Sequence, residues 1–280
     1  FFSTHNPAYA ILSGLVGSEM CIRDSHMGDA RLMFKYSSKF TPEQFKVFDG
    51  YFRPRNESFL AAKLEGKERT RWHYQRYIKN YLSCVKAVDE NVGRLLDYLD
   101  KQGLAENTVV VYSSDQGFYL GEHGCFDKRW MFDESLRTPL IARWPGVTKP
   151  GTESADMVSN VDFAETFLEI AGAAVPSEMQ GRSLVPVLKG ATPKDWRTSH
   201  YYHYYEAGGH GVPIHYGVTT KSYKLIRYPA PMDEWELYDL KKDPRELKSV
   251  FGRPEYARTV KRLEKELSNL RKVLKVAGEK

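Results

Sequence analysis

The longest regular pattern of apolar and polar positions lies between residues 73 and 100. Apolar side chains recur there every three or four residues, and charged residues lie between them. This spacing predicts one long amphipathic helix, and Gly103 behind it is a typical stop signal. Cys84 falls on the apolar side, so we expect it in the core. Residues 27–71 contain aromatic residues without a clear period, and no element is predicted there.

Two short apolar runs follow the long helix. Residues 108–112 (TVVVY) are β-branched or aromatic, which predicts a buried strand, and residues 139–144 (PLIARW) predict a second strand. A helix is expected over residues 161–171, with Ser159 or Asn160 as its cap. The order of helix, strand, loop, strand and helix predicts an α/β fold with helices packed on a largely parallel sheet.

The pattern changes after Trp196. Four short β-type runs are separated by Gly, Pro and Asp, which predicts a small antiparallel sheet over residues 200–205, 214–220, 223–228 and 235–240. The last pattern is a basic amphipathic helix at residues 254–276. Its apolar face consists of Val260, Leu263, Leu267, Leu270 and Leu274. We expect this helix to pack on the sheet, and binding to a membrane surface is the alternative.

The first 25 residues do not fit this organisation. Glu19 to Ser25 (EMCIRDS) resembles the translation of a transposon-type sequencing adaptor, so residues 1–25 are interpreted as a non-native leader. A signal peptide is the alternative, but the apolar run at residues 10–16 lacks a preceding basic residue. The remaining chain is divided into a core at residues 26–195 and a C-terminal subdomain at residues 196–280.

The composition of the chain limits the classes of function that we expect for it. The 41 Lys and Arg against 36 Asp and Glu give a net charge of +5, and 40 minus 34 gives +6 without the leader. This excess is mild and dispersed, so a nucleic-acid partner is not expected. No run of about 18 apolar residues occurs, so no membrane-spanning helix is expected. Three cysteines are too few for a disulfide-built scaffold.

Candidate metal ligands stand directly after the first predicted strand. Asp115 and Gln116 offer a carboxylate and an amide oxygen, which suit Ca²⁺ or Mg²⁺, and Gly117 allows a sharp turn behind them. Open α/β sheets place their ligand sites at such strand ends. An Asx-type turn that only closes the strand is the structural alternative.

Further polar residues follow in the same segment. His123 lies between glycines in GEHG and could protonate a leaving oxygen, and Lys128 could hold the oxygens of a tetrahedral anion. An ordinary loop histidine and a solvated basic pair with Arg129 are the alternatives. Arg137 is expected to pair with Asp133 or Glu134. Cys125 is expected to be a packed residue or a free thiol.

Several stretches together resemble the sulfatases of the alkaline-phosphatase-like superfamily. They are TVVVYSSDQGFYLGEHG, DKRWMFDESLRTPLIARWPG, HYQRYIKNYLSCVKAVDENVGRLLDYLD, MQGRSLVPVLKG and the ending WELYDLKKDPRELKSV. The resemblance covers residues 71–255 and is greatest to bacterial sulfatases that act on sulfated sugars, including glucosamine-6-sulfate-type enzymes. It implies an alkaline-phosphatase-like core, present in part, and a periplasmic or secreted location.

The resemblance also implies roles for individual residues. Asp115 and Gln116 fall on the later pair of Ca²⁺ ligands, with Mg²⁺ as a possible replacement, and Lys128 falls on the lysine that binds sulfate. His123 lies in the loop near the substrate, where the resemblance implies a catalytic role. The C-terminal subdomain would contribute sugar contacts, for which His210, His215 and Tyr216 are the candidates. A hairpin with ordinary hydrogen bonds is their alternative.

The chain departs from the family pattern at the nucleophile. The family uses a formylglycine made within C/S-x-[PA]-x-R, and no such motif occurs in the 280 residues. Cys125 has Asp127 where the motif needs Pro or Ala. We therefore expect the C-terminal portion of a sulfatase, with formylglycine in a missing N-terminal half, and no turnover by this chain alone.

The expected partner is a sulfated carbohydrate. In the intact enzyme a histidine would protonate the leaving sugar oxygen while Lys128 neutralises the sulfate. Two other functions stay open. One is a phosphoester hydrolase of the same superfamily, and the other is a non-catalytic glycan- or calcium-binding module.

Overall fold

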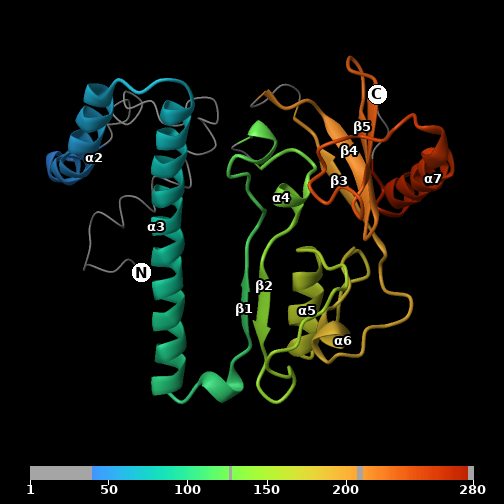
Figure 1. Ribbon diagram of the computed structural model, residues 1–280. Coiled ribbons are helices and arrows are strands. Elements are labelled where there is room, and N and C mark those ends of the chain that lie inside the picture. The colour runs from blue at the N-terminus through green and yellow to red at the C-terminus, as the bar shows by residue number, and fades with distance from the viewer. Residues whose placement is uncertain (1–39, 126–127, 207–210, 277–280) are drawn as a thin grey trace. The chain divides into compact units, whose positions relative to one another are not determined.

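The computed structural model describes residues 40–125, 128–206 and 211–276 of the chain (Figure 1). The chain divides into two compact units, which are described separately. The first, here called the helical unit, comprises residues 1–105 and 120–127. The second, the sheet unit, comprises residues 106–119 and 128–280. This division does not test the predicted boundary at residue 195, and the predicted leader at residues 1–25 lies outside the described residues.

The helical unit is built on α2 (Pro42–Ala62) and α3 (Gly66–Lys101). Helix α2 begins at a capping box, in which the Thr41 hydroxyl accepts from Gln44 N at 3.3 Å and Thr41 N donates to Gln44 Oε1 at 2.9 Å. Sequence analysis missed this helix. Its interior contains Pro54, a residue that disfavours helix interiors, and the tertiary packing of the aromatic residues overrides this preference.

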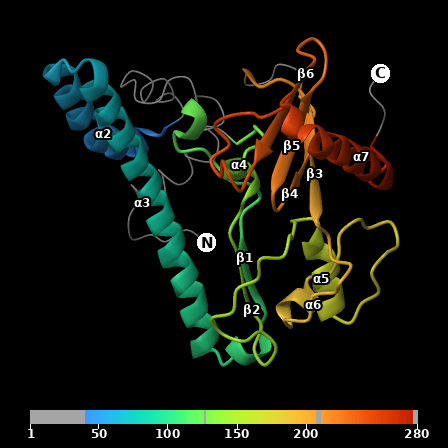
Figure 2. The ribbon, with the colours of Figure 1, turned by 45° about the vertical axis from the view of Figure 1, so that its right-hand side comes forward.

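Aromatic side chains join the two helices. Phe48, Phe52 and Phe59 of α2 are buried, and the ring centroids of Phe59 and Trp72 lie 4.1 Å apart in a stacked arrangement. Both ribbon views show α2 beside the N-terminal end of α3 (Figures 1 and 2). This contact positions the start of the long helix.

Helix α3 confirms the predicted long helix and extends it at its N-terminus. No residue of α3 is buried, and its exposed large apolar side chains are Tyr74, Leu82, Val85, Val88, Leu95 and Tyr98. Cys84 is half-buried rather than deep in a core, and this burial raises the pKa of its thiol. The stripe predicted from the sequence is therefore present, but much of it faces outward in the described structure.

The sheet unit starts with two paired strands, β1 (Val110–Ser113) and β2 (Leu140–Arg143). They run antiparallel, with Val111 opposite Ala142. The α/β fold class is confirmed, but the expectation of a largely parallel sheet is wrong for the described strands. Parallel neighbours need a crossover connection, and the one α-helix between β1 and β2 in the described residues is the single turn α4 (Asp133–Leu136).

Helix α5 (Asp162–Ile170) confirms the predicted helix, and α6 (Val185–Leu188) is a short helix after it. The predicted cap is wrong, because neither Ser159 nor Asn160 provides a side-chain cap. Instead the fully buried Asp162 carboxylate accepts from Ser159 N at 2.8 Å and pairs with Arg197 at 2.5 Å. The start of α5 is thus fixed by an ion pair to the segment before the C-terminal sheet.

The second sheet has four strands in sequential order. They are β3 (Ser199–Tyr204), β4 (His215–Thr220), β5 (Tyr223–Tyr228) and β6 (Glu234–Asp239), and every neighbouring pair is antiparallel. Helix α7 (Ala257–Val273) packs against this sheet. The predicted small antiparallel sheet with a terminal helix is confirmed. The remaining short helices are the 3₁₀ turns η5 (Ala105–Asn107), η6 (Glu122–Gly124) and η8 (Pro254–Tyr256).

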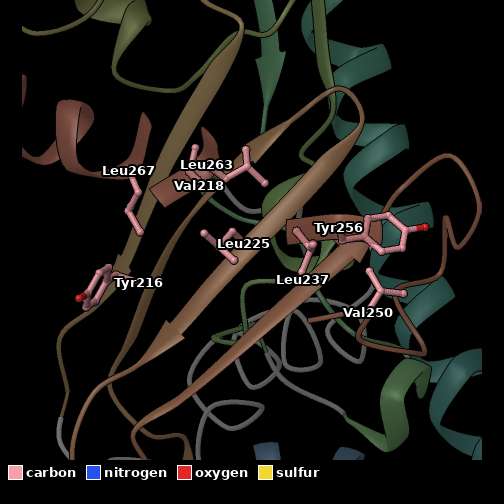
Figure 3. Close-up of a cluster of buried hydrophobic side chains, with 8 residues drawn as sticks. All are labelled: Tyr216, Val218, Leu225, Leu237, Val250, Tyr256, Leu263 and Leu267. Carbon is pink, nitrogen blue, oxygen red and sulfur yellow. The ribbon is translucent and has the colours of Figure 1, made fainter. Parts of the chain in front are cut away.

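The main core lies between α7 and this sheet (Figure 3). Val218, Leu225 and Leu237 lie opposite one another on β4, β5 and β6, and each is fully buried. Leu263 and Leu267 of α7 pack onto them, with exposed fractions of 1% and 3%. This packing confirms that the apolar face of the terminal helix covers the sheet. No helix in the described ranges is long and apolar enough to cross a membrane.

A Leu263→Ala substitution tests the energetic weight of this core. We expect it to lower the free energy of unfolding by about 2–5 kcal/mol, because it leaves a cavity where Leu263 is 1% exposed. Val273→Ala is the matched control on the same helix, since Val273 is 73% exposed. Urea unfolding monitored by circular dichroism measures both, and equal stabilities would show that α7 does not pack as described.

Candidate functional site

The loop after β1 carries the candidate metal ligands, and its course is fixed by Gly117. Gly117 N donates to Ser135 O at 2.8 Å, and a Cβ at this position would lie 2.0 Å from Glu134 O. Glycine therefore permits the close approach of this loop to α4. Ser114 Oγ adds a hydrogen bond of 2.8 Å to Gln116 O within the loop.

Ser135 connects this loop to the segment that carries Lys128. The Ser135 side chain is buried, and its hydroxyl donates to Lys128 O while its own carbonyl accepts from Gly117 N. Asp115, Gln116 and Lys128 are therefore held in one part of the sheet unit by a shared anchor. The backbone segments of these residues are thus joined, and a carboxylate, an amide oxygen and an ammonium group are the group types that would bind a cation and an anion.

A second tie joins the same two segments. Tyr119 is fully buried, its hydroxyl donates to Trp130 O at 3.0 Å, and it accepts from Phe132 N at 3.3 Å. The backbone on both sides of Met131 is thus fixed by one side chain from the loop after β1.

Residues 128–136, here called the lysine loop, are anchored to the C-terminal sheet by a buried ion network. Lys224 of β5 is fully buried, and its Nζ lies 2.8 Å from Asp133 Oδ1 and 2.6 Å from Glu246 Oε1. Asp133 N also donates to Glu246 Oε2 at 2.7 Å. Glu246 has a φ of +51°, a left-handed conformation that is uncommon for a residue with a side chain. Burial raises the pKa of Glu246, and Lys224 opposes this effect.

Met131 fixes the lysine loop by packing. Its side chain is fully buried with Ile226, Tyr228 and Tyr238. A Cβ on Gly217 would lie 2.7 Å from Met131 Sδ, so the absence of a side chain there makes room for the methionine. Ile226 and Leu225 are adjacent on β5 and point to opposite faces of the sheet. The lysine loop therefore covers the face that α7 does not.

His215 lies fully buried beneath the lysine loop. Four aromatic rings surround it, with centroid distances of 5.5–5.7 Å to Trp130, Tyr202, Tyr204 and Tyr228. Its Nδ1 bonds Pro213 O at 2.8 Å. Burial lowers the pKa of His215, and the Pro213 and Arg129 backbones act in the opposite direction. This environment favours the structural alternative, a hairpin with ordinary hydrogen bonds, over a sugar contact.

Three other candidate residues remain. Tyr216 points to the α7 face, where it is 6% exposed, and His210 lies outside the described residues. His123 belongs to the helical unit, within η6, and is half-buried with a φ of +55°. Its catalytic role stays a prediction. Cys125 is half-buried and takes part in no disulfide within the described residues.

The expected ion pair of Arg137 is confirmed. Its Nη1 lies 3.9 Å from Asp133 Oδ2, and the Arg137 side chain is largely exposed. Such an exposed pair contributes little to stability.

The residues at the strand end fit part of a Ca²⁺ or Mg²⁺ shell. The Asp115 carboxylate is exposed and accepts a long hydrogen bond of 3.4 Å from Ser114 Oγ, so its oxygens can turn toward a cation. Gln116 adds an amide oxygen. Within residues 40–125, 128–206 and 211–276, no group of three or more His, Cys, Asp or Glu forms a complete site. The pair is thus suited to complete a shell that other residues supply.

Sequence analysis missed the residues that hold the site together. Ser135, Lys224 and Glu246 were not singled out, although the lysine at the second position of the strand YKLIRY was a signal. A lysine in a strand of this kind is normally exposed, so its burial with two carboxylates could not be anticipated.

Family models match most of the chain. A model described as sulfatase matches residues 21–173, and one described as N-sulphoglucosamine sulphohydrolase, C-terminal, matches residues 121–273. Each covers more than half of the 280 residues. The chain belongs to the sulfatase family. The resemblance seen in the sequence is therefore confirmed.

Two relatives of the chain are named as sulfatases of N-acetylglucosamine 6-sulfate. The chain is 50% identical over 231 residues to the N-acetylglucosamine-6-O-sulfatase of Bacteroides thetaiotaomicron, which covers 81% of this chain and 41% of that protein. It is 31% identical over 170 residues to the human N-acetylglucosamine-6-sulfatase, covering 56% of this chain and 31% of that protein. The chain therefore spans less than half the length of these relatives.

Solved structures agree with this assignment. One of them, a protein in complex with its substrate D-glucosamine-2-N,6-O-disulfate, matches with a TM-score of 0.82 and 39% identity over 98% of this chain and 64% of that one. The phosphonate monoester hydrolase of Silicibacter pomeroyi matches with a TM-score of 0.66 and 26% identity over 73% of this chain and 45% of that one. The fold is shared between hydrolases of sulfate and phosphonate esters.

The buried network is tested by Lys224→Met. We expect a loss of about 3–5 kcal/mol in the free energy of unfolding, because the change leaves the buried Glu246 carboxylate without its cation and removes the ammonium partner of the half-buried Asp133. The double variant Lys224→Met with Glu246→Gln removes one of these carboxylates and should recover part of the loss. Lys221→Met is the control, since Lys221 is exposed in the turn before β5. Urea unfolding at pH 7 measures all three, and a Lys224→Met protein as stable as the control would refute the role of the network.

The burial of His215 predicts a pH dependence. Its folded pKa lies below the unfolded value of 6.5, so the unfolded state binds the proton more readily and stability falls as the pH drops below 6.5. We expect His215→Phe to be less stable at pH 7, because the bond to Pro213 is lost, but to lose less stability than the unaltered chain between pH 7 and 5. Urea unfolding across this range measures the slopes. His200, whose pKa burial also lowers, contributes equally in both proteins. Parallel stability curves would contradict the prediction.

Proposed function

We propose that this chain is the part of a sulfatase that grips the sulfate group and completes the metal shell during hydrolysis of a sulfated glycan. The observation that carries the proposal is the shared anchor at Ser135, which holds the Asp115 loop and Lys128 together at one strand end. Family membership supports the reaction class. The resulting pairing of oxygen ligands with an ammonium group suits a sulfate ester.

The proposed substrate class is a glycan that contains sulfated glucosamine. The support comes from two sulfatases named for N-acetylglucosamine 6-sulfate and from a solved complex with a glucosamine disulfate. The finer choice between N-sulfated and 6-O-sulfated sugars depends on sugar contacts, for which His210 stays a candidate outside the described residues.

The residues of this chain would act mainly by electrostatics. The Lys128 ammonium would neutralise charge on the sulfate oxygens as the ester bond to sulfur breaks. Asp115 and Gln116 would hold a Ca²⁺ or Mg²⁺ ion, whose chemistry is to polarise the sulfate. His123 is the candidate to protonate the leaving sugar oxygen. No residue here is assigned as nucleophile, because the formylglycine motif does not occur in the sequence.

A second candidate is hydrolysis of phosphate or phosphonate esters. It is supported by the phosphonate monoester hydrolase structure and by a multifunctional alkaline phosphatase superfamily protein of Trinickia caryophylli, which is 28% identical over 222 residues. That match covers 74% of this chain and 42% of that protein. A lysine beside a dication grips a tetrahedral phosphorus group as well as a sulfate.

A chimera tests the proposed function. The 231 matched residues of the Bacteroides thetaiotaomicron enzyme would be exchanged for those of this chain, leaving its own nucleophile in place. We expect the chimera to hydrolyse N-acetylglucosamine 6-sulfate in a Ca²⁺-dependent manner. Lys128→Ala should lower kcat/KM by about 10²–10³-fold, because an electrostatic contact to the transition state is lost. Asp115→Asn should raise the Ca²⁺ concentration required for half-maximal rate.

Matched controls separate the alternatives. Lys149→Ala removes an equal charge at an exposed position and should leave kcat/KM unchanged. Faster hydrolysis of the corresponding phosphate ester would support the second candidate. Retained sugar or Ca²⁺ binding with no turnover of either ester would support a non-catalytic module and would overturn the proposal.

A further inference from the structure

A cleft of about 390 Å³ lies between the C-terminal sheet and α7. Tyr216 of β4 and Trp235 of β6 form its sheet side, and Ser268, Arg271 and Lys272 lie on its α7 side. Figure 3 shows Tyr216 beside Leu267 of α7, at the edge of the buried core. The volume falls in the usual range of small-ligand pockets.

The aromatic side of the cleft is held rigidly. Trp235 stacks on Phe251 with an interplanar angle of 11° and a centroid distance of 6.2 Å. Tyr216 is 6% exposed and packs into the core beneath it. Fixed aromatic surface of this kind can pack against a sugar ring at low entropic cost.

The helix side of the cleft is basic. The Arg271 guanidinium lies 4.4 Å from the centre of the Tyr216 ring, so the cation is held next to the aromatic wall. Lys272 adds an exposed ammonium, while Glu264 contributes one negative charge to the lining. Helix α7 as a whole carries six Lys and Arg against two Glu, which gives +4 over residues 257–273. A polyanion would be attracted to this face.

We propose that this cleft binds a sulfated oligosaccharide at a second site, separate from the one at Lys128. Arg271, held against Tyr216, and Lys272 would bind sulfate groups, the Trp235 ring would pack on the sugar, and Ser268 and Glu264 would bond its hydroxyls. Tyr216 and Met131 lie on opposite faces of the sheet, so the two sites are on opposite faces as well. The ligand class rests on the proposed function, whereas the site rests on the cleft itself.

The experiment measures binding of a heparin-derived octasaccharide to the full 280-residue chain, without any need for turnover. Isothermal titration gives the Kd for the unaltered chain, for Arg271→Gln with Lys272→Gln, and for Lys261→Gln with Lys265→Gln. Both double variants remove two positive charges from α7, and Lys261 and Lys265 are exposed outside the cleft. We expect the cleft variant to raise Kd by about tenfold or more and the control by less than about threefold, because charge-assisted contacts depend on position.

Intrinsic fluorescence supplies an independent readout. The octasaccharide should change the tryptophan emission, and Trp235→Phe should abolish most of that change. Equal losses of affinity in the two double variants would show that binding depends only on the overall charge of α7, and would overturn the site. Loss of binding in Lys128→Ala but not in the cleft variant would also overturn it while leaving the proposed function intact.

Other outcomes are equally decisive. Failure of the chimera to hydrolyse sulfate, with octasaccharide binding at the cleft retained, would overturn the proposed function alone. No measurable octasaccharide binding would overturn the second site. Binding of phosphatidylserine vesicles that depends on Arg271 and Lys272, without such dependence for the octasaccharide, would assign this face to membranes instead.

Discussion

The ammonium group of Lys224 is the constraint on which the sheet unit depends. It lies without solvent exposure between Asp133 and Glu246, and each carboxylate comes from a different segment of the chain. Removing a charge from water is costly, and two close carboxylates together with the Asp133 N–H to Glu246 bond offset that cost. The main effect of the network is therefore to fix one position of the lysine loop, and its net contribution to stability is smaller.

The consequence of that position reaches the candidate site through α4. Asp133 begins α4, and two residues later Ser135 holds both Gly117 and the backbone of Lys128. The segments that carry Asp115 and Lys128 are thus tied through α4 to the C-terminal sheet, where Lys224 lies 91 positions after Asp133 in the sequence. A site on loops gains its precision in this way from a rigid scaffold.

Many of these elements could be predicted from the sequence. The reasons for success or failure differ from one element to the next. The four strands and α7 were predicted because short β-type runs between turn residues, and apolar positions at helical spacing, are local signals. Helix α2 was missed because its buried aromatic residues do not form a clear period, although its capping box at Thr41 was visible. The antiparallel pairing of β1 with β2 was not predicted, because strand direction depends on the path of the intervening chain. At the site, Asp115, Gln116 and Lys128 could be singled out from residue chemistry, whereas the burial of Lys224, Glu246 and His215 is a tertiary property.

Gly217 limits how segments of different family members can be recombined. On one side of β4 it leaves room for Met131, and Lys224 on the next strand is paired with Asp133. The lysine loop and the C-terminal sheet are therefore interlocked, even though the boundary predicted at residue 195 falls between them along the chain. Recombination at that boundary would combine Met131 and Asp133 from one parent with the space at Gly217 and the Lys224 ammonium from another. Exchange between parents should therefore keep everything from β1 to the end of α7 as one inherited block.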